Sequence, residues 1–297
     1  MKRIIFITLI YFCFSLLFLC AFQEKSQPTI PPLDVDLNYR ALTPGEVIKV
    51  SVKGVSSSRF AEIRFLGKKY LMGNKEDTYE YFSIVGIDLG QNPGNYSLVI
   101  SVVGNDGSIE RFEKVISIST KEFPVKRLWV KEEFVTPPSE SLERISRESE
   151  ILKAIYEIYT PQWLGDGKFI IPSEGEVAPN FGERRIFNNK PRSSHSGVDI
   201  STPFGYPVRA SNSGRIVLAS DLYFAGKSVI IDHGLGVFTQ YLHFSKIKAK
   251  RGDFVEKGSV IGEIGATGRV TGPHLHWGIR IFRNRVDPFS LLALDLE

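Results

Sequence analysis

The chain has 297 residues, of which 42% are hydrophobic and 24% are charged, and its formal net charge is +4 at pH 7. This length accommodates about two ordinary domains, each with its own core. The positive excess lies in the C-terminal part and is too small and too scattered to indicate the clustered basic face of a nucleic-acid-binding protein, so we expect no nucleic-acid partner.

Residues 1–22 have the layout of an export signal. A positively charged start is followed by an apolar run, and polar residues come next. The apolar run is longer than the roughly 7 to 15 residues of most signal cores, so two fates stay open: a cleaved signal peptide and a retained anchor in the inner membrane. The sequence LFLC, which ends at Cys20, also resembles a lipoprotein cleavage site, although Leu19 stands where such sites have a small residue. We therefore expect an exported protein of the periplasm or cell envelope.

Both cysteines, Cys13 and Cys20, lie within this leader. The rest of the chain can therefore form no internal disulfide and offers no thiolate ligand for a metal. A metal site in the exported part must use nitrogen and oxygen ligands.

Residues 23–33 are predicted to be a proline-rich linker, and residues 34–120 are predicted to form a β-sandwich of immunoglobulin-like type. Short alternating segments such as VIKVSVKG and YEYFSIVGI are separated by turn residues, and Asn-Asp-Gly is a hairpin signal. A sandwich assigns no chemistry by itself. We expect a spacer or positioning module, with binding to the cell wall as the functional alternative.

Residues 121–164 are predicted to form a linker that contains a helix. Two prolines precede a serine-rich start, which is typical of a helix N-terminus. Apolar residues then recur at helical spacing, namely Leu142, Ile145, Leu152, Ile155, Tyr156 and Tyr159. We expect this helix to pack one face on a neighbour and to expose its charged face to solvent.

Residues 165–297 are predicted to form a second compact domain rich in strands. Segments such as GRIVLAS, KSVIIDHG and GVFTQYLH alternate with glycine-rich turns. The fold class is therefore mainly all-β, with an N-terminal sandwich, a helical linker and a C-terminal β-rich domain.

All five histidines lie between residues 195 and 276. His274 and His276 stand two residues apart in a predicted strand, so their side chains project to the same face. His195 and Asp199, in HSGVD, add an imidazole and a carboxylate. With His276 they make three nitrogen and oxygen ligands, the number that a catalytic Zn²⁺ typically takes from the protein while a water fills the fourth position.

Three motifs, HSGVDIS, YLHFS and TGPHLHWGI, occur in this order along the chain. Together they closely resemble the lysostaphin/LytM-like zinc metallopeptidases, which cut the peptides of bacterial peptidoglycan. The segments FGERR, GDFVEKGSVIGEIGATG and VDPF extend the resemblance over about residues 165–290. The resemblance implies a LytM-like peptidase domain that holds one Zn²⁺.

By this resemblance, His195, Asp199 and His276 bind the zinc, and His243 and His274 are the catalytic histidines. All five motif positions are occupied, which favours a working enzyme. Which of the two catalytic histidines is the general base stays open.

Two other residues near the motifs are expected to be structural. His233 ends a predicted strand at DHGLG, where a hydrogen-bonded ring is the simpler interpretation. Asp287, in VDPF, precedes a proline and is expected to form a turn rather than to act as a catalytic acid.

These patterns predict a zinc metalloendopeptidase that hydrolyses peptide bonds in peptidoglycan cross-links or stems during cell-wall remodelling. The alternative is a non-catalytic peptidoglycan-binding regulator that activates a separate wall amidase, and the complete ligand set argues against it. A third interpretation is a secreted lytic enzyme directed at other bacteria. Protein regulators, and a covering of the groove by the N-terminal part, stay open.

Overall fold

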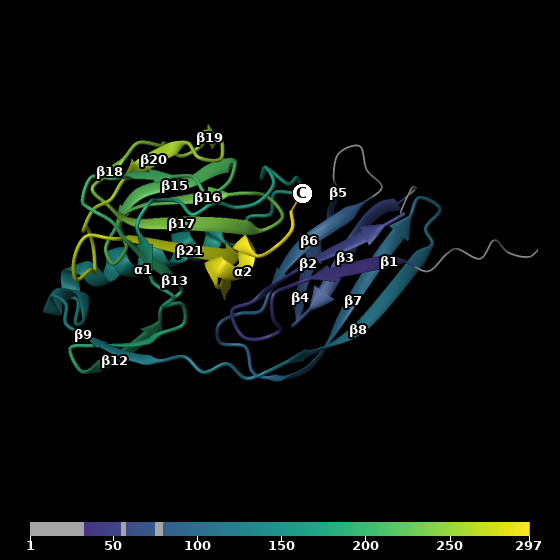
Figure 1. Ribbon diagram of the computed structural model, residues 1–297, viewed down its shortest axis with the longest axis horizontal. Helices are drawn as coiled ribbons and strands as arrows, with labels where there is room; N and C mark the ends of the chain where they lie inside the picture. Colours follow the sequence, from purple (N-terminus) through teal and green to yellow (C-terminus); the bar gives the residue numbers. More distant parts are fainter. Residues whose placement is uncertain (1–32, 55–57, 75–79, 297) are drawn as a thin grey trace, which may run out of the picture. The chain divides into compact units, whose positions relative to one another are not determined.

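The computed structural model describes residues 33–54, 58–74 and 80–296, and β-strands are the main element of this part (Figure 1). The predicted all-β fold class is confirmed. The expectations for the leader and for nearly all of the proline-rich linker concern residues outside the described ranges. Within these ranges, no helix is both long and apolar enough to cross a membrane.

The N-terminal part consists of two four-stranded antiparallel sheets. The first has the order β1-β2-β6-β5, with β1 (Asp34–Asn38), β2 (Val47–Lys53), β6 (Tyr81–Gly86) and β5 (Gly73–Asn74). The second has the order β4-β3-β7-β8, with β4 (Lys68–Leu71), β3 (Ser58–Phe65), β7 (Gly94–Gly104) and β8 (Ile109–Ile118). Fully buried residues such as Val50, Ile63, Ile84 and Ile100 form its core, and each contributes roughly 1.5–3 kcal/mol through burial.

The linker that follows is more structured than its sequence indicates. It contains β9 (Val125–Leu128), the 3₁₀ helix η1 (Glu132–Phe134) and α1 (Ser139–Ile155). The predicted helix is therefore present, and it begins directly after Pro138. Only its C-terminal end packs closely: Ile155 is buried against the next domain, whereas Leu142 is 53% exposed.

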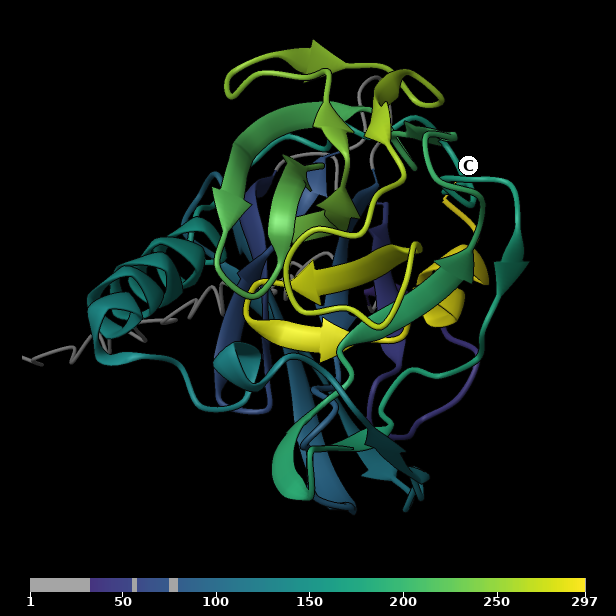
Figure 2. The ribbon, with the colours of Figure 1, turned by 90° about the vertical axis from the view of Figure 1, so that its left-hand side faces the viewer.

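The C-terminal part, which faces the viewer in Figure 2, is built on one large antiparallel sheet. The strand order is β10-β13-β21-β17-β16-β15-β19, and β22 pairs with β21. Its strands are β10 (Glu176–Val177), β13 (Gly197–Ser201), β21 (Leu275–Ile281), β17 (Val237–Phe244), β16 (Gly226–Asp232), β15 (Gly214–Leu222), β19 (Phe254–Val255) and β22 (Asn284–Val286).

Two small sheets and a short helix complete this part. The first sheet is β12-β11-β9, with β11 (Arg184–Phe187) and β12 (Lys190–Ser194). The second is β14-β20-β18, with β14 (Pro207–Arg209), β20 (Val260–Glu263) and β18 (Lys246–Ile247). The helix α2 (Pro288–Leu292) is capped by Asp287, whose side chain accepts a hydrogen bond from Phe289 N. Asp287 is thus a structural residue, as expected.

Strand β21 lies between β13 and β17 in the large sheet and determines which residues can face the site. Leu275, Trp277 and Ile279 are completely buried on one face. His276 projects to the opposite face because successive side chains of a strand alternate. The sequence predicts that His274 and His276 share one face, and for His276 the burial of Leu275 and Trp277 on the other face is consistent with this.

His233 is a fully buried core residue with both ring nitrogens engaged. Its Nδ1 lies 2.7 Å from Ser213 O and its Nε2 lies 2.8 Å from Thr239 Oγ1. Burial lowers the pKa of His233 from 6.5 to about 4. Its ring is therefore neutral at pH 7, which agrees with the structural role expected for it.

We predict that His233 makes folding sensitive to acid. Because its pKa is lower in the folded than in the unfolded chain, its neutral form stabilises the fold above pH 6.5, and this contribution is lost as the pH falls towards 4. The loss is roughly 3 kcal/mol, at about 1.4 kcal/mol per pKa unit. Denaturant unfolding of wild type and His233→Gln at pH 7.5 and pH 4.5, with a chelator present, should show a smaller pH dependence in the variant. Equal pH dependence in both proteins would contradict this role.

Candidate active site

Three side chains that could hold a metal ion meet at the junction of β13 and β21. Asp199 on β13 lies directly opposite His276 on β21 in the antiparallel register, and His195 stands two residues before β13. His195 Nε2 lies 2.8 Å from His276 Nδ1 and 3.0 Å from Asp199 Oδ1. His276 Nδ1 lies 3.2 Å from the same oxygen. The structure thus brings together three residues that the sequence selects as ligands.

The spacing of these donor atoms suits a tetrahedral metal. Ligands at 2.0–2.1 Å from a tetrahedral Zn²⁺ are about 3.3 Å apart, close to the three distances above. His195 Nδ1 lies 3.0 Å from the carbonyl oxygen of Asn180, so Nδ1 carries the proton and the lone pair of Nε2 faces Asp199. Lone pairs gathered in this way repel one another unless a cation lies between them. Two imidazoles and one carboxylate suit Zn²⁺ better than Mg²⁺ or Ca²⁺.

The protonation of two of these groups also suits metal binding. Burial lowers the pKa of His276 to about 4, so the ring is neutral at pH 7. Burial alone would raise the pKa of Asp199, but its contacts with His195 and His276 hold that pKa well below its usual value. Asp199 is therefore ionised, as a metal ligand must be.

Asn180 and Arg185 orient Asp199 from the side opposite to the histidines. Asn180 Nδ2 donates to Asp199 Oδ2 at 3.0 Å, and Arg185 Nη2 donates to the same oxygen at 2.7 Å. Asp199 N donates to Asn180 Oδ1 at 3.1 Å. Oδ2 is thus held by these partners while Oδ1 faces the imidazoles, an arrangement usual for carboxylates beside metals.

Sequence reasoning assigned no role to Asn180 or Arg185. Asn180 lies 15 residues before His195, and neither periodicity nor spacing connects the two. Arg185 belongs to the segment FGERR, so the only available signal was the family motif itself.

Gly197 allows the two strands to approach at the site. A Cβ atom at this position would lie 2.4 Å from Trp277 O and 2.7 Å from His276 Nε2. Any side chain at this position would therefore displace His276 or the backbone of Trp277, which explains why a glycine stands between His195 and Asp199.

His243 and His274 stand next to the three ligands. His243 is near the end of β17, and His274 directly precedes β21. Their ring centroids are 5.0 Å apart, and His274 Nε2 lies 3.7 Å from Asp199 Oδ1. Each ring places Nδ1 against a carbonyl oxygen, at 2.8 Å from Thr267 O for His243 and at 2.9 Å from Gly272 O for His274. Nδ1 therefore donates in both rings, and Nε2 is the nitrogen with a lone pair.

His243 is the more enclosed of the two rings. Burial, followed by the nearby rings of His274 and His276, lowers the pKa of His243 well below its usual value. Its ring is therefore neutral in the metal-free protein at pH 7.

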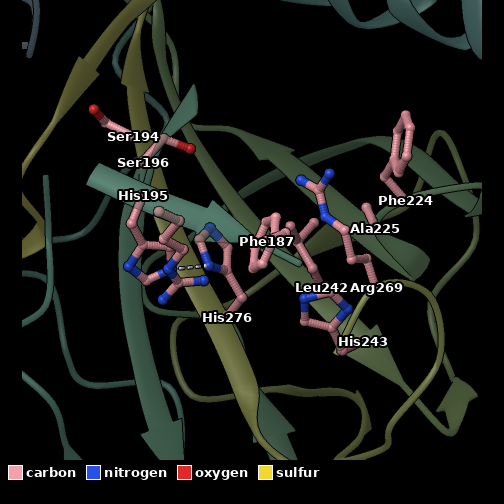
Figure 3. Close-up of a pocket in the computed structure, with 11 residues that line it drawn as sticks. Phe187, Ser194, His195, Ser196, Phe224, Ala225, Leu242, His243, Arg269 and His276 are labelled. Carbon is pink, nitrogen blue, oxygen red and sulfur yellow. Dashed lines mark hydrogen bonds between the residues drawn. The ribbon is translucent and has the colours of Figure 1, made fainter. Parts of the chain in front are cut away.

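Two cavities adjoin these residues and have His243 in common. The larger, of about 160 Å³, lies beside His195 and His276 (Figure 3). The smaller, of about 100 Å³, lies beside Asp199 and His274. All five residues selected from the sequence thus border a space that a substrate can reach. Three lining residues of the smaller cavity come from the linker: Lys126, Leu128 and Val130.

A His-Asp-His donor set with two further histidines beside a cleft is the site of a metal-dependent peptidase. The model of peptidase family M23 matches residues 193–288 of the chain. A crystal structure of a putative M23 peptidase from Pseudomonas aeruginosa is 30% identical, with a TM-score of 0.66, and the match covers 86% of this chain and 96% of that one. The chain belongs to peptidase family M23, which confirms the resemblance seen in its motifs.

Curated relatives match the C-terminal part. The peptidoglycan DD-endopeptidase ShyA of Vibrio cholerae is 41% identical over 119 residues, which are 40% of this chain and 27% of ShyA. The DD-carboxypeptidase/endopeptidase Mpg of Neisseria gonorrhoeae is 44% identical over 97 residues, or 33% of this chain and 22% of Mpg. The matched segment thus spans about a quarter of the length of these relatives.

We predict that Asn180→Ala weakens metal binding without unfolding the protein. The substitution removes two hydrogen bonds that orient Asp199, and loss of such partners typically lowers metal affinity about 10- to 100-fold. Competition with a chromogenic chelator would give the zinc affinity. Asn95→Ala, on an exposed part of β7, is the control. Equal zinc affinity in wild type and Asn180→Ala would show that Asn180 does not orient the ligand.

Proposed function

We propose that the protein is an exported, zinc-dependent endopeptidase that hydrolyses peptide bonds in the cross-links or stems of peptidoglycan, for remodelling of the cell wall. The observation that carries this proposal is the convergence of His195, Asp199 and His276 beside the two cavities, with His243 and His274 next to them. The names of the relatives ShyA and Mpg support a peptide substrate in the wall. The leader supports export to the periplasm or envelope.

Zinc is the proposed metal, held by His195, Asp199 and His276. When bound, it would supply a Lewis acid for the scissile carbonyl and a nucleophile at neutral pH. Asn180 and Arg185 hold Oδ2 of Asp199, so that Oδ1 is directed towards the two imidazoles.

His243 and His274 would divide the proton transfer and the stabilisation of charge. In each ring the carbonyl partner holds the proton on Nδ1, so Nε2 is the atom that exchanges protons with the substrate. One Nε2 accepts a proton from the attacking water and passes it to the leaving amine. The other, when protonated, donates a hydrogen bond to the developing oxyanion.

We predict that the protein cuts purified peptidoglycan only when its metal site is intact. Zinc-loaded protein that lacks residues 1–22 would be incubated with peptidoglycan, and the soluble products would be identified by mass spectrometry. Cross-linked dimers should disappear with wild type and persist with His276→Ala. The fragment masses would identify the scissile bond. Binding of zinc and wall without cleavage would instead favour the non-catalytic regulator.

A second pair of variants separates metal binding from proton transfer. His276→Ala removes one of three ligands, so we expect zinc to be lost together with activity. His243→Ala should retain zinc, because His243 Nδ1 is bonded to Thr267 O and the ring lies outside the triad, and should lower kcat by about 10²- to 10⁴-fold. Metal analysis of the dialysed proteins gives the zinc content. A zinc-free His243→Ala protein would contradict this division of roles.

A further inference from the structure

Arg269 lies in the loop between β20 and β21 and lines both cavities beside the metal ligands. Its guanidinium carbon lies 4.8 Å from the ring centroid of Phe187 and 4.8 Å from that of Phe224 (Figure 3). Its backbone N–H donates to Phe224 O at 2.8 Å. Both the backbone and the side chain of Arg269 are therefore fixed beside the site.

The two phenylalanines come from segments distant along the chain, and both line the larger cavity. Phe187 ends β11, and Phe224 lies in the turn between β15 and β16. The face of an aromatic ring attracts the positive charge of a guanidinium. The guanidinium is also the cationic group whose planar array of N–H donors matches the geometry of a carboxylate.

The charges that line the two cavities are mainly positive. Lys126, Arg185 and Arg269 are cationic, and Asp199 is the one acid among the described lining residues. Arg185 is already bound to Asp199 at 2.7 Å. The histidines aside, the lining has two more positive than negative charges before a metal is added. Glu183, whose carboxylate lies 3.9 Å from Lys126 Nζ and 3.8 Å from Arg185 Nη2, offsets one of them. Such a site attracts an anionic group.

We propose that Arg269 binds a carboxylate of the substrate peptide next to the scissile bond, so that the enzyme prefers peptides with a free carboxylate over their carboxamides. This inference rests on the proposed function and adds the chemistry by which its substrate is recognised. Because Arg269 and His243 line the same two cavities, the bound carboxylate lies beside a catalytic histidine rather than at a remote subsite. Arg269 is thus a substrate-binding residue that determines specificity.

The test compares three cross-linked stem-peptide dimers. In the first all carboxyl groups are free, in the second the side-chain carboxyl group beside the cross-link is a carboxamide, and in the third the C-terminal carboxyl group is a carboxamide. We expect one of the two amidations to lower kcat/KM of the wild type by about 10- to 100-fold, as for the loss of a hydrogen bond between charged groups. The amidation that does so identifies the source of the carboxylate. Equal kcat/KM for all three dimers would overturn the proposal.

Variants of Arg269 connect this preference to the residue. Arg269→Gln should cut the free dimer about as slowly as wild type cuts the carboxamide. For this variant, kcat/KM of the free dimer and of the carboxamide should agree within about twofold. Arg269→Lys should retain part of the preference, because it keeps the charge but not the fork. Arg215→Gln, which removes an exposed arginine of β15, is the matched control. A full preference in Arg269→Gln would refute the assignment.

Two further measurements separate a binding role from a structural one and from failure of the proposed function. The thermal unfolding temperature and the zinc content of Arg269→Gln show whether loss of the contacts with Phe187 and Phe224 disturbs the fold or the metal site. Calorimetry with His274→Ala gives the affinities for uncleaved dimers. In the double variant His274→Ala/Arg269→Gln, the difference in affinity between the carboxylate and the carboxamide dimers should disappear. If wild type cuts no dimer, the proposed function fails, while equal affinities in calorimetry would overturn the role of Arg269 independently.

Discussion

The register between β13 and β21 is the constraint on which the site depends. It sets Asp199 directly opposite His276, and the close strand approach at Gly197 keeps that alignment. Once these two residues are fixed, His195 needs only to fold back from the end of β12 for its Nε2 to reach them. A shift of one residue would turn His276 into the hydrophobic core and Leu275 towards the metal. The large buried side chains beside His276, above all Trp277, make such a shift unfavourable.

Gathering three lone-pair donors in a buried place is unfavourable without positive charge nearby. Arg185 provides part of that charge at Asp199 Oδ2, and a bound metal would provide the rest at Oδ1. The same demand accounts for the chemistry of the surroundings. Arg185 contacts Asp199 directly, and a second cation, Arg269, lines the same cavity.

The linker is the section of the N-terminal half that borders the site. Its strand β9 pairs in parallel with β11, and Val130 O accepts a hydrogen bond from Asn188 Nδ2. Glu133 O then accepts one from Tyr223 OH, in the turn between β15 and β16. Among the residues that the structure describes, the linker lines the smaller cavity, whereas no strand of the sandwich and no residue of α1 does. Access to His274 and to one side of His243 thus depends on the linker.

The sequence predicts the parts of the site that follow from local rules. The period of two in a strand is enough to separate His276 from Leu275, and the fold class follows from alternation and turn residues. Asn180, Arg185 and β9 could not be found in this way, because their contacts join segments distant along the chain. The roles of individual site residues stay predictions from the motif until the variants are measured.

His243 shows most clearly why alternation alone cannot build this site. Leu242 pairs with His276, and both Leu242 and His243 line the larger cavity, although neighbours in a regular strand face opposite sides. The register of β16 and β17 shifts near this point, and His243 has φ of 70°, a left-handed conformation that costs a residue with a side chain roughly 1–2 kcal/mol. The hydrogen bonds from His243 N to Ala225 O and from Nδ1 to Thr267 O hold the residue in place. The strained backbone therefore turns a side chain that would enter the core towards the metal ligands, and strain of this kind is common at functional sites.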